Sequence, residues 1–229
     1  FEVIYVNDAC PDNSLRELRL LAQEFLNVKI VTLKRNVGQL KAVMVGLTQS
    51  VGDYVVIMDA DLQDPPEAIT DLYAKCQEGY DTVFAGRRGL YQSLPRIVTS
   101  VLYKFTMHIL TGVPRDAGMY MLINQKVLRE ILRLSVTRPF IIGQIGLSKA
   151  SNTSIPVRRN SRDHGESSYS TMMRFRMGMS RVGYALAFRL GLSQMLYREY
   201  ISSFNFLKNN VDTENSYSLL TEDVYAIKK

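Results

Sequence analysis

The first 86 residues alternate short apolar runs with amphipathic segments, and this alternation constrains the fold more than any other feature. The runs expected to form strands are 1–7, 28–34, 53–59 and 81–85. The segments expected to form helices are 14–26, 38–50 and 68–78. Strands that alternate with helices build βαβ units, and apolar strands without polar alternation are typical of a sheet covered on both faces. The sequence therefore predicts an α/β fold whose mainly parallel sheet is flanked by helices.

The periodicity is weaker after residue 86. The expected helices there are 93–111, 125–134 and 170–189, and the expected strands are 119–124 and 152–157. The polar tail 209–229 is expected to pack loosely or to be disordered. Because the chain opens inside an apolar run and does not begin with Met, we expect that an N-terminal strand-and-helix unit is missing from it.

Composition excludes several classes of protein. Cys10 and Cys76 lie far apart, without CxxC spacing or a nearby histidine pair, which argues against a disulfide scaffold or a zinc site and favours a reducing compartment. No run reaches the roughly 18 apolar residues that cross a bilayer, and no signal peptide is visible, so a cytoplasmic location is expected. The net charge of +6 favours an anionic partner without distinguishing nucleic acid, membrane phosphate and a diphosphate.

The most informative segment is VVIMDADLQDPPE, residues 55–67. Asp59 ends an apolar run and Asp61 follows two residues later, so on extended backbone both carboxylates project to the same side. Two neighbouring carboxylates repel each other unless a cation or a proton neutralises them. Ligands bind at the carboxyl end of the strands in open α/β sheets, and hard oxygen ligands favour Mg²⁺ or Mn²⁺ shared with substrate phosphates. The segment therefore predicts a metal–diphosphate site, with Pro66 opening the next helix.

Two other interpretations of this segment are weaker. A calcium loop of the EF-hand type needs Gly at its sixth position and Glu at its twelfth, where this chain has Asp64 and Thr70. A polar turn with a helix-capping acid explains Asp61 or Asp64 alone, but it gives no reason for Asp59.

DADLQDPPE resembles the D-x-D signature of family 2 glycosyltransferases, and it is most similar to the dolichol-phosphate mannosyltransferase and bacterial polyprenyl-phosphate glycosyltransferase branch. Four further segments between residues 1 and 184 resemble family motifs in the expected order: VNDACPDNS, NVGQLKAVMVGL, FAGRR and GESSYS. The resemblance implies a GT-A, Rossmann-like fold that binds a nucleotide sugar. It also implies that Asp59, Asp61 and Gln63 contact the donor through Mn²⁺ or Mg²⁺.

The resemblance also implies further donor contacts. Asp8 matches an acid that contacts the base or the ribose, although an Asx-turn cap is an alternative. Arg87 matches an arginine placed to bind the diphosphate, and a solvated basic turn is the alternative. Lys41, in the helix that follows Asn36 and Gly38, is a further candidate for a donor contact.

The polar stretch 158–169 corresponds to a loop that closes over the donor in related enzymes. Its candidate donor contacts are Arg162 and Ser167. Ser168 stands where the family has Lys, so the positive charge either comes from Arg162 or is missing from this loop. A solvated basic loop is the alternative.

The family implies an inverting reaction in which a metal at Asp61 neutralises the leaving nucleoside diphosphate. A sugar hydroxyl acceptor needs a base and a phosphate acceptor does not. Asp116 is the candidate base, and a structural Asp in a turn is an equally good interpretation. The family's second acid and its arginine in this motif are replaced by Met119 and Met121.

The segment 172–196 places arginines among apolar residues, which is typical either of a helix on an anionic membrane surface or of one packed on its own domain. Residues 1–190 are predicted to form the GT-A domain, with 1–86 binding the nucleotide sugar, 87–190 forming the acceptor half and lid, and 191–229 an extension. The expected partners are a nucleotide-diphosphate sugar, a lipid-phosphate or glycan acceptor and the inner face of the membrane, and not nucleic acid. The pattern indicates no particular sugar, nucleobase or oligomeric state. The alternatives are a sugar-phosphate nucleotidyltransferase, which needs a Gly-rich phosphate loop, and a non-catalytic nucleotide-binding module.

Overall fold

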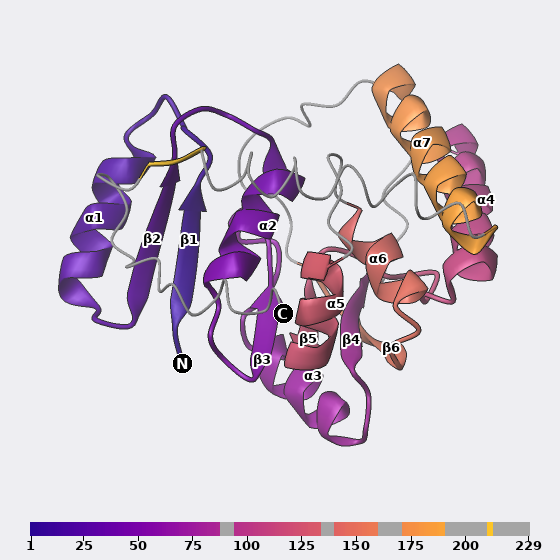
Figure 1. The fold of residues 1–229 in the computed structure, drawn as a ribbon, viewed down its shortest axis with the longest axis horizontal. Helices are drawn as coiled ribbons and strands as arrows, with labels where there is room; N and C mark the ends of the chain where they lie inside the picture. Colours follow the sequence, from indigo (N-terminus) through magenta and orange to yellow (C-terminus); the bar gives the residue numbers. More distant parts are fainter. Residues whose placement is uncertain (88–93, 134–139, 160–170, 191–209, 213–229) are drawn as a thin grey trace. The chain divides into compact units, whose positions relative to one another are not determined.

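The computed structural model describes residues 1–87, 94–133, 140–159, 171–190 and 210–212. The chain forms two units, one built mainly from Phe1–Val55 and the other from Val56–Glu130 and Phe140–Gln194 (Figure 1). Each unit contains its own sheet, so each is described by itself.

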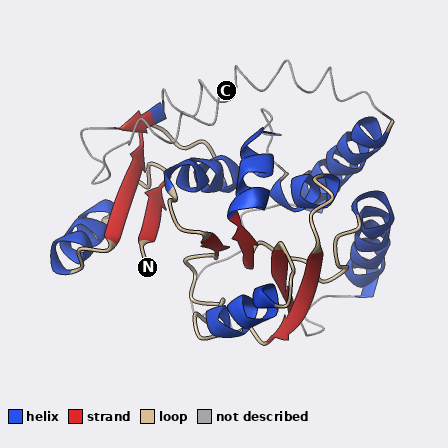
Figure 2. Cartoon of the chain, turned by 60° about the horizontal axis from the view of Figure 1, so that its bottom comes forward, coloured by secondary structure: helices blue, strands red, loops and turns tan. Residues whose placement is uncertain are grey.

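The first unit has a three-stranded sheet in the order β1-β2-β7 (Figure 2). Strands β1 (Val3–Asn7) and β2 (Val28–Leu33) pair in parallel, and helix α1 (Ser14–Glu24) between them packs on both. Helix α2 (Gln39–Gln49) packs on β1. The short β7 (Val211–Asp212) lies antiparallel to β2. The polar tail, predicted to pack loosely, therefore contributes at least these two residues to a sheet.

The second sheet has the order β3-β5-β4-β6. Its strands are β3 (Tyr54–Ile57), β4 (Thr82–Arg87), β5 (Met121–Asn124) and β6 (Asn152–Val157). Strand β6 runs parallel to β4, whereas β5 runs antiparallel to β4. The carboxyl ends of β4 and β6 and the beginning of β5 therefore lie at the same edge of the sheet, which we call the active edge.

Both faces of the β4–β5 pair are buried. Val83 pairs with Leu122 and packs against Leu72 and Cys76 of α3 (Ala68–Gln77), which covers one face. The neighbouring Phe84 is fully buried on the other face. This burial explains why these strands show no polar alternation in the sequence.

Three helices of this unit pack against one another. Helix α4 (Leu94–Thr111) packs against α6 (Ile141–Leu147) and α7 (Thr171–Arg189), and α6 also packs against α7 (Figure 1). Met107, Phe140 and Ala185 form the buried centre of this cluster. The remaining helix, α5 (Gln125–Arg133), follows β5 directly.

The α/β class and the predicted order of elements are confirmed, with three corrections. The sheets are mixed rather than mainly parallel, because α4 packs on α6 and α7 and the chain re-enters the sheet at the edge where β4 ended. The third strand ends at Ile57 rather than Asp59. Helix α6 was not predicted, because its seven residues are too few for a clear helical period.

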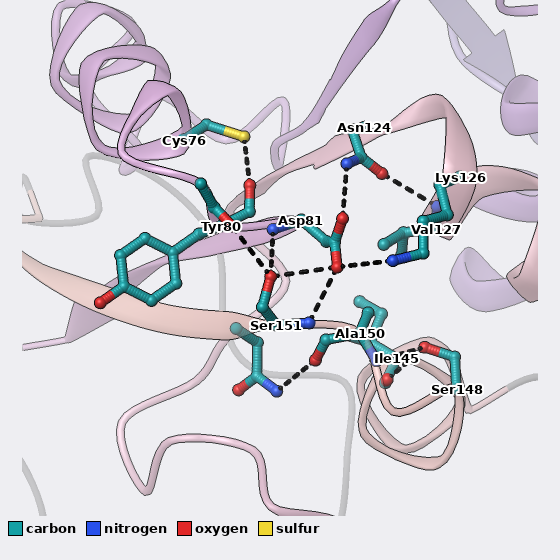
Figure 3. Close-up of polar contacts among 12 residues, drawn as sticks. Cys76, Tyr80, Asp81, Asn124, Lys126, Val127, Ile145, Ser148, Ala150 and Ser151 are labelled. Atoms are coloured by element: carbon teal, nitrogen blue, oxygen red, sulfur yellow. Dashed lines mark hydrogen bonds and ion pairs between the residues drawn. The ribbon is translucent and has the colours of Figure 1, made fainter.

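Asp81 joins three strands at the edge opposite the active edge (Figure 3). Its carboxylate accepts hydrogen bonds from Asn124 Nδ2 (2.9 Å) and from the backbone N–H and hydroxyl of Ser151 (2.9 and 3.0 Å), and it lies 3.1 Å from Lys126 Nζ. Burial raises the pKa of this carboxyl, but the bonds from Asn124, Ser151 and Lys126 outweigh burial and lower the pKa to about 2. The folded state therefore favours the ionised form.

We expect Asp81→Ala to lower the free energy of unfolding by about 2 kcal/mol at pH 7. Because the folded pKa lies below the unfolded pKa of about 4, the contribution is complete above pH 4 and is lost as the pH falls towards 2. Urea unfolding at pH 7, 4 and 3 measures the free energy of unfolding that Asp81→Ala loses. The control is Asp71→Ala, which removes an exposed carboxylate. A difference between the variants that does not shrink with acidity would contradict this role of Asp81.

Candidate active site

The loop after β3 lies at the active edge and carries the predicted acids. We call residues 59–64 the acidic loop. The Oδ1 atom of Asp61 accepts a hydrogen bond from the backbone N–H of Gln63 (3.2 Å), which closes a tight turn. Leu62, between them, has a positive φ of 61°, a conformation that L side chains rarely adopt. Asp59 lies two residues beyond β3 in this loop, so its carboxylate is not positioned by extended strand backbone as predicted.

Asp64 anchors the acidic loop from within the protein. Its side chain is fully buried, its Oδ1 lies 2.5 Å from Arg159 Nε, and its Oδ2 accepts the backbone N–H of Asp59 at 3.2 Å. A buried carboxylate needs a charged partner and hydrogen bonds, and Asp64 has both. It is therefore a structural anchor rather than the exposed helix-capping acid considered from the sequence.

Arg159 connects the end of β6 to two acids of this loop. Besides Asp64, its NH2 group contacts Asp59 Oδ2 at 3.3 Å. Burial lowers the pKa of the guanidinium, but the hydrogen bond to Asp64 and the charges of Asp64, Asp59 and Asp61 outweigh burial and raise it. All three carboxylates of the acidic loop thus act on one guanidinium.

Tyr120 supports the same loop from the segment before β5. It is almost fully buried, and its hydroxyl donates a 2.7 Å hydrogen bond to the backbone carbonyl of Pro65. Burial and the nearby carboxylates of Asp64 and Glu67 raise the pKa of Tyr120 to about 12, so its hydroxyl remains a donor at neutral pH. Tyr120 therefore holds Pro65, the residue that follows the acidic loop, whereas Arg159 contacts the loop itself.

The donor set fits a divalent ion only in part. Asp59, Asp61 and Gln63 offer oxygen atoms from one loop, whereas no group of three or more acidic, histidine or cysteine side chains among the described residues could hold a metal ion. Mg²⁺-type sites commonly use one or two carboxylates and take their remaining ligands from substrate phosphates and water. The loop suits an ion that is shared with a diphosphate.

Asp116 lies at the active edge beside β4 and β6. Ser154 Oγ donates a 2.8 Å hydrogen bond to Asp116 Oδ1. The carboxylate packs directly over Gly86, where an added Cβ would lie 2.7 Å from Asp116 Cγ. A residue with any side chain at position 86 would displace this carboxylate.

We expect Gly86→Ala to lower the free energy of unfolding by about 1–3 kcal/mol, because the new methyl group overpacks the site. Urea denaturation measures the change. The control is Gly183→Ala in α7, where an added Cβ meets nothing within 4 Å. That substitution is expected to be neutral or stabilising, and equal losses in the two variants would refute the crowding at Gly86.

In the first unit, Asp8 follows β1 and holds the segment before α2. Its two carboxylate oxygens accept the backbone N–H groups of Val37 (2.7 Å) and Gly38 (2.8 Å). Gly38 has a φ of 89°, which favours glycine. Lys41 lies in the first turn of α2. Asp8 therefore has a structural role, and the predicted contacts of Asp8 and Lys41 with the donor stay predictions.

A sequence model described as Glycosyl transferase family 2 matches residues 1–132, more than half of the chain. The chain belongs to this family. Its relatives include the uncharacterized glycosyltransferase YkcC of Bacillus subtilis, 30% identical over 80% of this chain and 57% of that protein. Another is the undecaprenyl-phosphate 4-deoxy-4-formamido-L-arabinose transferase of Pseudomonas fluorescens, 35% identical over 75% of this chain and 52% of that protein. The chain spans about half the length of these curated relatives.

The fold of this family 2 member is also found in a solved structure. Glucosyl-3-phosphoglycerate synthase from Mycobacterium tuberculosis, crystallised with Mn²⁺, UDP-glucose and phosphoglyceric acid, superposes with a TM-score of 0.52. The match is 18% identical and covers 79% of this chain and 68% of that one. At this identity the likeness establishes the fold, which is the predicted GT-A fold.

The side chains of three predicted donor-binding residues lie outside what the structure describes. Arg162 and Ser167 lie outside the described residues. The backbone of Arg87 ends β4 at the active edge. Their contacts with the donor stay predictions.

Arg159, Asp64 and Tyr120 are site residues that sequence reasoning did not assign. The structure shows side chains that keep alternating beyond the end of β6, where Val157 is buried, Arg158 is exposed and Arg159 is again partly buried. The sequence V-R-R by itself does not distinguish the two arginines. Continued alternation indicates a side chain that points back to the core side of the strand.

Two arginines of α7 contact other parts of the protein. Arg181 lies 5.0 Å from the ring centre of Phe140, and Arg189 NH1 donates to the carbonyl of Ile109 at 2.9 Å. Helices α4 and α7 nevertheless expose large apolar side chains: Val101, Leu102, Phe105, Ile109, Met179 and Leu186. In the part of the chain that the structure describes, no helix is long and apolar enough to cross a membrane.

Proposed function

We propose that this chain binds a nucleotide-diphosphate sugar through a divalent ion at the acidic loop and transfers the sugar, with inversion, to a lipid-phosphate acceptor. The observation that carries the proposal is the acidic loop itself, whose Asp59 and Asp61 both lie near Arg159 at the active edge. The Mn²⁺ and UDP-glucose bound by the structural neighbour give independent support. In the reaction the bond from the anomeric carbon to the diphosphate breaks, and a bond to the acceptor oxygen forms on the opposite face.

Each part of the chain has a proposed task. Asp59, Asp61 and Gln63 hold Mn²⁺ or Mg²⁺, which supplies positive charge where the leaving diphosphate gains negative charge. Tyr120 and Asp64 keep the loop in place before the donor arrives. The remaining proposed donor contacts are Asp8, Lys41, Arg87, Arg162 and Ser167.

The acceptor decides whether a base is needed. A phosphate oxygen is already anionic at pH 7 and attacks without deprotonation, whereas a sugar hydroxyl needs a base. Asp116 is the candidate base, but its carboxylate accepts from Ser154 and is packed over Gly86. A phosphate acceptor makes no demand on Asp116, and the relative named as an undecaprenyl-phosphate transferase supports this class.

The experiment has two stages. Thermal shift with UDP, GDP, CDP and dTDP, each with and without Mn²⁺, is expected to show stabilisation by one diphosphate that depends on the ion. The matching nucleotide sugars are then offered with polyprenyl phosphate in detergent or with oligosaccharides. Transfer to polyprenyl phosphate supports the proposal. Diphosphate binding without transfer to any acceptor would instead indicate a nucleotide-binding module.

We also propose that α4 and α7 contact an anionic membrane surface, where a lipid-phosphate acceptor resides. Exposed Leu102 and Phe105 on α4 lie near basic groups: Lys104 is exposed, and the Arg115 guanidinium lies 4.8 Å from the Phe105 ring centre. Apolar side chains among basic ones are typical of interfacial helices.

Sedimentation with phosphatidylglycerol vesicles tests this contact. Phe105→Glu is expected to reduce binding at least about fivefold, since it adds a negative charge and removes an apolar anchor. Leu20→Glu alters another exposed apolar side chain, on α1, and is expected to leave binding unchanged. Equal binding by both variants would exclude α4 from the contact.

A further inference from the structure

Arg159 brings positive charge to a loop that carries three carboxylates. Among the described residues, its guanidinium contacts Asp59 and Asp64 directly, and the charge of Asp61 also acts on it. Without this guanidinium the acidic loop would be more negative, and the ion-loaded site would attract an anionic diphosphate less strongly.

Arg159 also hinders an ion that arrives alone. Its NH2 group lies 3.3 Å from Asp59 Oδ2, one of the oxygens offered to the ion. Two cations that share a carboxylate repel each other. The contact of Arg159 with Asp59 is also longer than its contact with the buried Asp64. The small number of acidic ligands among the described residues points the same way, because a lone ion would find few protein ligands there.

The same guanidinium suits the diphosphate. Arginine offers five N–H donors in a planar fork that matches phosphate oxygens. Among the described residues, Arg159 uses Nε for Asp64 and NH2 for Asp59. A diphosphate bound to an ion at Asp59 and Asp61 would lie beside this fork.

We propose that Arg159 couples the two ligands: it opposes binding of the divalent ion alone and strengthens binding of the diphosphate to the ion-loaded site. The site then accepts ion and diphosphate as a pair. This inference rests on the proposed function and names the residue that links its two ligands. By linkage, the coupling is reciprocal.

A purely structural role makes a different prediction. If Arg159 only neutralises Asp64, its loss distorts the acidic loop and weakens binding of the ion and of the diphosphate together. If Arg159 couples the ligands, its loss changes the two affinities in opposite directions. Changes of opposite direction in the two affinities therefore distinguish coupling from a purely structural role of Arg159.

The experiment measures binding rather than turnover. Mn²⁺ alone is titrated by the electron paramagnetic resonance signal of free Mn²⁺. The diphosphate that the wild-type chain binds is measured by equilibrium dialysis at saturating Mn²⁺. For Arg159→Gln we expect Mn²⁺ alone to bind about three- to tenfold more tightly, and the diphosphate to bind at least about tenfold more weakly. Arg158→Gln, on the exposed neighbour, is expected to change neither affinity more than about twofold.

A second variant guards against misfolding. Arg159→Gln leaves Asp64 buried without its cation, so the double variant with Asp64→Asn is measured as well. Relative to the Asp64→Asn single variant, which has lost the same carboxylate charge, the double variant is expected to show the same opposite shifts. Parallel weakening of both ligands, or no change in either, overturns the coupling. If the wild-type chain binds no diphosphate with Mn²⁺, the proposed function itself fails, and the two failures are thus distinguished.

Discussion

Asp61→Asn is expected to reduce sugar transfer at least about 100-fold while leaving the fold intact. The asparagine side-chain oxygen can still accept the Gln63 N–H, so the turn of the acidic loop is retained. The lost charge weakens the hold on the divalent ion and leaves the departing diphosphate less neutralised. Turnover is measured with saturating donor and Mn²⁺, and circular dichroism reports the fold.

The matched control for this variant is Asp71→Asn, which removes an exposed carboxylate in the first turn of α3. It is expected to keep turnover within about twofold, since an exposed charge away from the site is strongly screened. Full activity of Asp61→Asn would remove the acidic loop from the reaction. Equal losses in both variants would point to a general effect of charge.

Asp64→Ala is expected to lower the free energy of unfolding by about 3 kcal/mol. The substitution removes the acceptor of the Asp59 N–H and leaves the partly buried Arg159 without its closest partner. Breaking a buried ion pair from one side leaves an uncompensated charge, which costs more than the pair contributes. Urea denaturation at pH 7 measures the difference.

Two further variants define the origin of that loss. Asp53→Ala removes an exposed carboxylate and is expected to change the free energy of unfolding by less than about 0.5 kcal/mol. Asp64→Asn keeps an acceptor for the Asp59 N–H but not the charge. Its loss of free energy of unfolding should therefore lie between those of Asp53→Ala and Asp64→Ala. A loss below about 1 kcal/mol for Asp64→Ala would show that the buried pair does not anchor the loop.

Local patterns were enough to predict most of the elements. The helix expected at 38–50 is α2 (Gln39–Gln49), and the strand expected at 81–85 is β4 (Thr82–Arg87). Both follow from the spacing of apolar residues within a dozen positions, which is visible directly in the sequence. The acidic segment was likewise visible, because Asp59 and Asp61 follow an apolar run directly.

Contacts between distant segments could not be predicted in this way. Asp64 and Arg159 are 95 residues apart, and neither the burial of Asp64 nor its partner follows from neighbouring residues. The reversed direction of β5 depends on α4 packing against α6 and α7 instead of crossing the sheet. The left-handed backbone of Leu62 is equally hidden, because leucine carries no signal for a positive φ.

The most direct test of the metal site is anomalous diffraction from crystals grown with Mn²⁺ and the diphosphate that the chain binds. We predict one manganese peak within coordination distance, about 2.0–2.4 Å, of a carboxylate oxygen of Asp59 or Asp61 and of a diphosphate oxygen. A diphosphate bound at the active edge with no manganese peak at the acidic loop would contradict the account.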